Sequence, residues 1–214
     1  MSIDAVFIDL DGTLTDPKPG ITGCIRHAQE KLGLPVSHAD ELTWCIGPPM
    51  QESLCKIAGS EEAGARMLVH YRERYGRVGL FENSVYPGVP EALKALRVAG
   101  PRLYVATSKA RVYAERILDH FNLAGYFDRI FGSELDGTNM RKTDLLRFAL
   151  SETGENPAKA LMVGDREHDA IGARAHGLTP IGVLWGYGSR KELEAAGVTR
   201  LLERPAQLSE ILKI

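Results

Sequence analysis

The chain has few cysteines and no long uninterrupted apolar run. Its 214 residues include three cysteines, Cys24, Cys45 and Cys55. An odd number without Cys-x-x-Cys spacing argues against a disulfide framework and against a zinc site. Charged residues interrupt every apolar stretch, so no membrane span is expected. Residues 1–4 lack the basic and apolar parts of a signal peptide. We therefore expect a cytoplasmic protein that does not enter a membrane.

The sequence also lacks any block of residues with charge of one sign. The 26 Lys and Arg residues nearly balance 28 Asp and Glu residues, which gives a formal net charge of −2. Without a basic block, electrostatic binding to nucleic acid or to a membrane surface is not expected. The hydrophobic content of 44% is enough for one core plus a small second module. Either a monomer or a homodimer is compatible with this composition.

Two turn-rich stretches, "TDPKPG" at 15–20 and "NSVYPGVP" at 83–90, divide the chain. Between them, apolar residues recur at helical spacing, as in Ile21, Cys24, Ile25, Ala28 and Leu32. No strand is predicted in that part. We expect a catalytic core of residues 1–16 and 85–214, with residues 17–84 inserted as an all-helical cap. Gly20 and Gly88 lie where hinges of such a cap are expected.

Outside the insert, strand-like and helix-like patterns alternate. We expect strands at 5–8, 102–107, 128–133, 159–165 and 180–186, and helices at 109–121, 142–154, 166–177, 189–197 and 205–214. Such alternation predicts an α/β fold, a Rossmann-like parallel sheet with helices on both faces.

Polar residues gather where the predicted strands end, which is the edge at which open parallel sheets bind ligands. Asp9 and Asp11 close the first strand, and alternation puts both on one face of it. Two like charges so close need a cation or a shared proton to offset them. The other residues of this kind are Thr107 and Ser108, Lys142 at a helix start, and Asp165 with Asp169 four residues later.

These residue types suit one chemical task. Three carboxylates are the ligands that a hard cation such as Mg²⁺ prefers. A lysine and a hydroxyl offer donors to an anion, and Gly12 permits close approach of the backbone to a phosphoryl oxygen. Together they are the parts needed for phosphoryl transfer through an aspartyl-phosphate.

The motifs Asp9-Leu-Asp11-Gly-Thr13, Thr107, Lys142 and Gly164-Asp165-x-x-x-Asp169 resemble the four motifs of the haloacid dehalogenase superfamily. Their order and spacing match, and the resemblance covers essentially the whole chain. The insert resembles the helical cap of the phosphoglycolate phosphatase-like branch, as do "GPPMQESL" and "YPGV".

The resemblance implies a role for each matched position. Asp9 is the nucleophile and a Mg²⁺ ligand, and Asp11 is the acid and base, its backbone carbonyl also contacting the metal. Asp165 is the remaining protein ligand, while Asp169 orients Lys142 or a metal-bound water from outside the ligand shell. Phosphoryl oxygens are held by Thr107 and Lys142, with Gly12, Thr13 and Ser108 also at the phosphate. Ser108 departs from the Asn that the family often has there.

The expected activity is Mg²⁺-dependent hydrolysis of a small phosphorylated metabolite, like a phosphoglycolate phosphatase or a 5'-nucleotidase. Asp11 favours phosphate esters over haloacids, because an alkoxide leaving group needs a proton and a halide does not. Alternatives are a sugar phosphomutase and, with less support, a pyrophosphate hydrolase or a phosphonate-cleaving enzyme using Lys56. A phospho-accepting receiver and a degenerate scaffold fit less well. Lys109 could reach the phosphate from the start of its helix, but a surface position is the better expectation for it, and Arg166 and His168 are expected to be solvated helix residues.

Overall fold

Six parallel strands form the central sheet, in the order β5-β4-β1-β6-β7-β8. The computed structural model describes residues 2–212, and it confirms the predicted α/β class. The strands are β1 (Ala5–Ile8), β4 (Arg102–Ala110), β5 (Arg129–Ser133), β6 (Ala160–Gly164), β7 (Thr179–Val183) and β8 (Arg200–Leu202). The edge strand β8 was not predicted, since three residues are too few for a periodic pattern.

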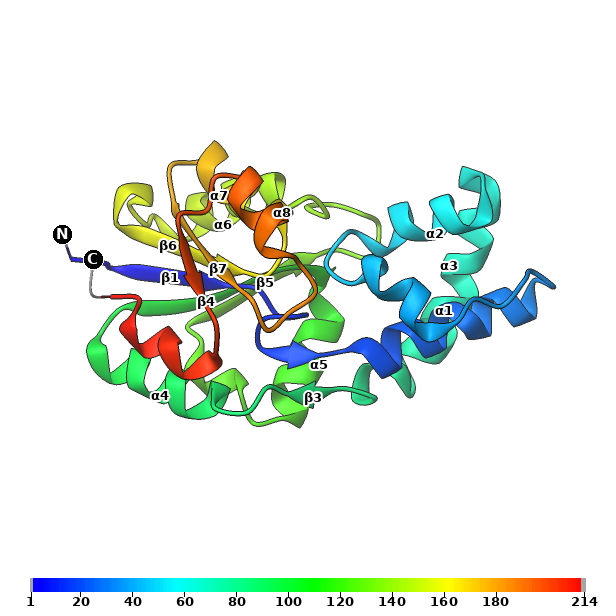
Figure 1. Cartoon of the computed structure of the whole chain (residues 1–214), viewed down its shortest axis with the longest axis horizontal. Helices are drawn as coiled ribbons and strands as arrows, with labels where there is room; N and C mark the ends of the chain where they lie inside the picture. The colour runs from blue at the N-terminus through cyan, green and yellow to red at the C-terminus, as the bar shows by residue number, and fades with distance from the viewer. Residues whose placement is uncertain (1, 213–214) are drawn as a thin grey trace.

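Strand β1 is buried on both faces of the sheet. Val6 and Ile8 enter one hydrophobic core, whereas Ala5 and Phe7 enter the other. The first core is completed by α4 (Val89–Ala99), α5 (Arg111–His120) and the 3-10 helix η5 (Pro205–Glu210). The second is completed by α6 (Lys142–Thr153) and α7 (Glu167–Ala175), with α8 (Arg190–Ala195) packed on α7 (Figure 1). This two-sided burial explains why β1 reads as an uninterrupted apolar run.

Residues 17–84 form a group of helices beyond the carboxyl ends of the sheet strands (Figure 1), called the helical segment below. Its elements are α1 (Lys18–Lys31), η1 (Ala39–Cys45), α2 (Met50–Ala58), α3 (Glu61–Tyr75) and η2 (Gly79–Phe81). Two strands that were not predicted, β2 (Thr15–Asp16) and β3 (Ser84–Val85), pair antiparallel at its base. They bring the chain into and out of the segment at one place.

The two glycines expected at hinges serve different purposes. Gly20 lies within the first turn of α1, where an added Cβ would be 2.0 Å from the Gly79 carbonyl oxygen. It therefore permits close packing of two backbones within the helical segment. Gly88 precedes α4 with a φ of +90°, a conformation that favours glycine, so it stays a candidate hinge.

An amphipathic helix was predicted at 205–214, but the described part of this range forms a shorter 3-10 helix. This 3-10 helix is η5, and the expected range runs past residue 212, outside the described residues. The start of η5 is held by Gln207, whose side-chain oxygen accepts hydrogen bonds from the amides of Glu203 and Arg204. The remaining 3-10 helices are η3 (Ala124–Tyr126) and η4 (Pro157–Lys159). No helix within residues 2–212 has the length and apolar character to cross a membrane.

Candidate active site

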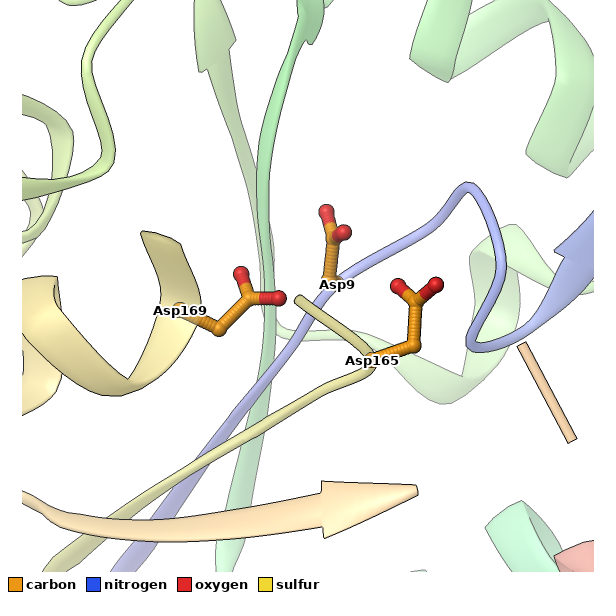
Figure 2. Close-up of side chains that lie close together, drawn as sticks. All are labelled: Asp9, Asp165 and Asp169. Carbon is orange, nitrogen blue, oxygen red and sulfur yellow. The ribbon is translucent and has the colours of Figure 1, made fainter. Parts of the chain in front are cut away.

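Three buried aspartates converge at the carboxyl edge of the sheet (Figure 2). Asp9 follows β1, Asp165 follows β6, and Asp169 lies in the first turn of α7. One carboxylate oxygen from each lies within 4.8 Å of the other two. The structure thus brings together Asp9 and Asp165, both predicted as metal ligands, and adds Asp169 to them. The Asp11 side chain lies outside this group, and the interaction predicted for Asp11 was through its backbone carbonyl.

Lys142 neutralises part of this negative charge. Its buried ammonium lies 2.7 Å from Asp169 Oδ1 and 3.0 Å from Asp9 Oδ1, and it donates a hydrogen bond of 2.7 Å to the Ala106 carbonyl. The ammonium thus combines two ion pairs with one hydrogen bond to the backbone. The start of α6 at Lys142, which the sequence predicted, aims the side chain toward β1.

One ammonium among three buried carboxylates leaves an excess of negative charge. Burial, followed by Asp169 and Asp9, raises the pKa of Asp165 well above its usual range. Burial likewise raises the pKa of Asp169, although Lys142 opposes the effect. A divalent cation would offset this excess, and oxygen ligands at this spacing suit Mg²⁺. The donor set therefore fits the predicted metal.

Asp165 is held by the turn after β1 and by the loop after β7. Thr13 Oγ1 lies 3.4 Å from Asp165 Oδ1, and the Tyr187 amide donates to Oδ2 at 2.8 Å. An added Cβ at Gly12 would lie 2.3 Å from Asp165 Oδ2. Gly12 and Thr13, predicted at the phosphate, thus pack against Asp165.

The loop "WGYG" (residues 185–188) was not recognised from the sequence. Trp185 Nε1 donates to the Thr13 carbonyl at 3.0 Å, and the Tyr187 hydroxyl donates to Asp16 in β2. Added Cβ atoms at Gly186 and Gly188 would collide with Asp165. Two glycines flanking an aromatic residue directly after a strand were the signal for this close approach.

Lys109 is buried at the end of β4, so its expected position on the surface is wrong. Its ammonium lies 2.9 Å from Asp11 Oδ2 and donates a hydrogen bond to the hydroxyl of Tyr75, on α3 of the helical segment. Burial disfavours the charge, but Asp11 and Tyr75 outweigh it and raise the pKa of Lys109. Burial raises the pKa of Asp11, with Lys109 opposing.

Arg166 is likewise not the solvated residue that was expected. Its side chain is only 13% exposed, it lies 2.8 Å from Glu192, and it donates to the Ile46 carbonyl of the helical segment. Arg166 directly follows Asp165 in the chain. Its side chain therefore connects this end of the sheet to the loop before α2. The neighbouring His168 is partly buried, and burial lowers its pKa.

A cavity of about 90 Å³ lies between the sheet edge and the helical segment. Asp9, Asp11, Thr107, Ser108 and Lys109 contribute to its wall on the sheet side. Apolar and aromatic residues dominate the rest, including Pro48, Pro49, Met50, Leu68, Tyr71, Tyr75, Tyr113 and Met140. A mainly apolar lining with a few polar groups is typical of a small-molecule site. Thr107 and Ser108, predicted at the phosphate, thus share a cavity wall with Asp9.

Comparisons with known proteins find a matching family model and several similar proteins. The family model described as haloacid dehalogenase-like hydrolase matches residues 6–183. The 5'-nucleotidase of Pseudomonas aeruginosa is 44% identical over 209 residues, covering 97% of this chain and 95% of the relative. The phosphoglycolate phosphatase of Aquifex aeolicus is 30% identical over 207 residues, covering 97% and 95%.

Two further relatives extend the comparison. The tyrosine-protein kinase PtkA of Mycobacterium tuberculosis is 43% identical over 194 residues, which cover 91% of this chain but 66% of that longer protein. The crystal structure of a predicted phosphatase from Clostridium acetobutylicum superposes with a TM-score of 0.96, at 38% identity and full coverage of both chains.

Proposed function

The chain belongs to the haloacid dehalogenase-like hydrolase family, and we propose that it is a phosphatase that hydrolyses small phosphate monoesters through an aspartyl-phosphate on Asp9. The observation that carries the proposal is the placement of Asp9. Its carboxylate is paired with Lys142, lies beside Asp165 and Asp169, and forms part of the cavity wall. A buried nucleophile beside cationic groups is suited to attack on phosphorus.

In the first step, Asp9 attacks phosphorus while the bond from phosphorus to the leaving oxygen breaks. Lys142 offsets charge on Asp9 and the transferred group, and Thr107 donates to a phosphoryl oxygen. Asp11 gives a proton to the leaving oxygen. In the second step, Asp11 takes a proton from the water that attacks the phosphorus, which frees Asp9 and releases phosphate.

We infer that Asp9 and Asp165 hold Mg²⁺, with the Asp11 carbonyl as a further ligand and Asp169 beside them. When bound, the ion supplies positive charge that reduces the repulsion between an anionic phosphoryl group and Asp9. Lys142 then serves two carboxylates, and its contact with Asp169 keeps it beside the nucleophile.

The aromatic lining of the cavity favours a phosphate ester with a partly apolar leaving group, such as a nucleoside monophosphate. Among the described wall residues, the fixed cations are Lys109 and Arg72. Lys109 is paired with Asp11, and Arg72 donates to the Leu135 carbonyl at 2.8 Å. The carboxylate of phosphoglycolate would therefore meet Arg72 as its one cation without a carboxylate partner on the described wall, whereas a nucleobase would meet several aromatic side chains.

The alternatives differ in their support. Lys56, the lysine considered for a phosphonate-cleaving mechanism, is exposed and is 5.9 Å from the Trp44 ring centroid, away from the described cavity wall. A sugar phosphomutase would use the same Asp9 and Asp11, so it differs from a phosphatase in its product and not in this geometry.

The test is an assay of released phosphate from nucleoside monophosphates, 2-phosphoglycolate, sugar phosphates and pyrophosphate with Mg²⁺. We expect the highest kcat/KM for a nucleoside monophosphate, and loss of nearly all activity in Asp9→Asn. An Asp9→Asn variant with activity near wild type contradicts the mechanism.

Two other outcomes would support other activities. Isomerised sugar phosphate without released phosphate supports the mutase, and phosphate transferred from ATP to a tyrosine peptide supports a kinase.

A further inference from the structure

Lys109 links two residues that belong to different parts of the molecule. It contacts the carboxylate of Asp11, after β1, and the hydroxyl of Tyr75, near the end of α3. Its ammonium also lies 4.5 Å from the centroid of the Tyr75 ring. Lysine side chains are seldom buried without a specific partner, so this one is held in place by both contacts.

Tyr75 is itself fixed from both sides. Its ring stacks on Tyr71 of the same helix, with centroids 5.1 Å apart, and meets the edge of Tyr113 on α5 at 5.3 Å. The residue is 1% exposed. The position of the Tyr75 hydroxyl is therefore set by packing of the helical segment against the core.

The two oxygens of Asp11 have different surroundings. Oδ2 is paired with Lys109, whereas Oδ1 is buried and has no hydrogen-bond partner among residues 2–212. A carboxylate held through one oxygen has its rotation restricted, and its other oxygen is left available. An acid or base must lie within hydrogen-bond reach of the atom whose proton it transfers, so this restriction bears directly on reactivity.

We propose that Lys109 is a positioning residue for Asp11, and that Tyr75 keeps Lys109 in place when the helical segment is packed over the sheet edge. Through these contacts, Asp11 is oriented for proton transfer only when the segment is in this position. The inference rests on the proposed function, because it takes Asp11 as the group that protonates the leaving oxygen.

Leaving groups of different basicity reveal this role. Phenyl phosphate and 4-nitrophenyl phosphate have similar rings, but phenolate is the more basic leaving group and depends more on a proton from Asp11. The ratio of their kcat/KM values on one enzyme preparation does not depend on the fraction of active protein. A structural defect that only reduces the amount of active enzyme leaves this ratio unchanged.

We expect Lys109→Met to reduce kcat/KM for phenyl phosphate about tenfold more than for 4-nitrophenyl phosphate. Tyr75→Phe, which retains the ring and removes the hydroxyl, should change the ratio in the same direction by about threefold. Tyr104→Phe is the matched control. It removes the hydroxyl that donates to Glu155 at 2.7 Å, from the same strand as Lys109 but away from the cavity wall, and should leave the ratio as in wild type.

Asp11→Asn separates this inference from the proposed function. If Asp11→Asn shifts the ratio toward 4-nitrophenyl phosphate and neither Lys109→Met nor Tyr75→Phe does, Asp11 is the acid but the positioning role is overturned. If Asp11→Asn leaves the ratio unchanged, the acid role in the proposed function is itself overturned. A shift toward phenyl phosphate in Lys109→Met also overturns positioning, since Lys109 would then be withholding the proton. Should Lys109→Met fail to fold, Tyr75→Phe decides alone.

Discussion

Lys142 lies closer to Asp169 than to the proposed nucleophile, at 2.7 Å from Asp169 Oδ1 and 3.0 Å from Asp9 Oδ1. Asp169 also accepts a hydrogen bond from the Arg166 amide through its other oxygen, at 3.2 Å. It therefore caps its own helix and holds the lysine at once. The resemblance implied the lysine-orienting role, and the structure contains that contact together with the one that caps the helix.

Replacing Lys142 by methionine should destabilise the protein strongly. The substitution leaves Asp9, Asp165 and Asp169 buried without an ammonium, and we expect the free energy of unfolding to fall by about 3 kcal/mol in the absence of metal. Urea denaturation measures this. Lys159→Met is the control, because its contact with Asp4, 3.2 Å long, is exposed and should contribute less than about 1 kcal/mol. Similar losses in both variants would contradict the account of the buried cluster.

Asp165→Asn should have opposite effects without and with Mg²⁺. In metal-free protein the substitution removes a buried charge next to Asp9 and Asp169, so the melting temperature should rise. Wild-type protein should gain about 2.7 kcal/mol of stability at Mg²⁺ a hundredfold above its Kd, and the variant should gain much less. Thermal melts with EDTA and with Mg²⁺ give both values. An equal Mg²⁺ response in the two proteins would exclude Asp165 as a ligand.

Gly186→Ala should weaken metal binding through Asp165. An added Cβ would lie 2.3 Å from the Gly12 carbonyl oxygen and 2.5 Å from Asp165 Oδ2, so the loop or the carboxylate must move. We expect Mg²⁺ affinity to fall about tenfold, as is usual when a group that orients a ligand is disturbed. Isothermal titration measures the affinity. Gly125→Ala, where an added Cβ meets nothing within 4 Å, should bind Mg²⁺ like wild type.

The Arg74–Glu82 pair at the base of the helical segment should make stability depend on pH. Arg74 donates two hydrogen bonds to Glu82, at 2.6 and 2.8 Å, and these lower the pKa of Glu82. Because the pKa of Glu82 is lowered in the folded state, the ion pair stabilises the protein at pH values above the ordinary pKa of glutamate. This contribution is lost as the pH falls through the lowered pKa.

Glu82→Gln tests this pH dependence directly. The variant should be less stable than wild type by about 1 kcal/mol at pH 7, given that the pair is partly exposed. The difference should shrink as the pH falls below about 4.3, the ordinary glutamate value. Denaturation curves at several pH values measure it, and a difference that stays constant down to pH 3 would rule out an ionic contribution.

The sheet and the acidic cluster were predictable because both follow from local pattern. Each buried strand reads as an apolar run, and the first polar residue after the run marks its carboxyl end, as at Asp9 and Asp165. A parallel sheet then brings those ends to one edge. Lys142 was predictable for the same reason, since it begins a helix at that edge.

Lys109 and Arg166 were misjudged because their partners come from distant parts of the chain. Nothing near Lys109 in the sequence indicates that Tyr75 will cover it, and nothing near Arg166 indicates that the Ile46 carbonyl will face it. Tertiary contacts of this kind override the general preference of lysine and arginine for the surface. The short strands β2, β3 and β8 were missed because periodicity needs more residues than they have.

The position of β1 in the sheet has a consequence for how the chain is made. β1 lies between β4 and β6, with Ala5 paired to both Arg102 and Ala160. Both partner strands are synthesised long after β1. The backbone of β1 therefore has no strand partner, and its apolar side chains are not covered, until β4 and β6 have been made. Sequence-distant pairing of this type slows folding and leaves aggregation-prone surface exposed in the meantime. The strand that precedes the proposed nucleophile is thus a part of the sheet that depends on protection during biosynthesis.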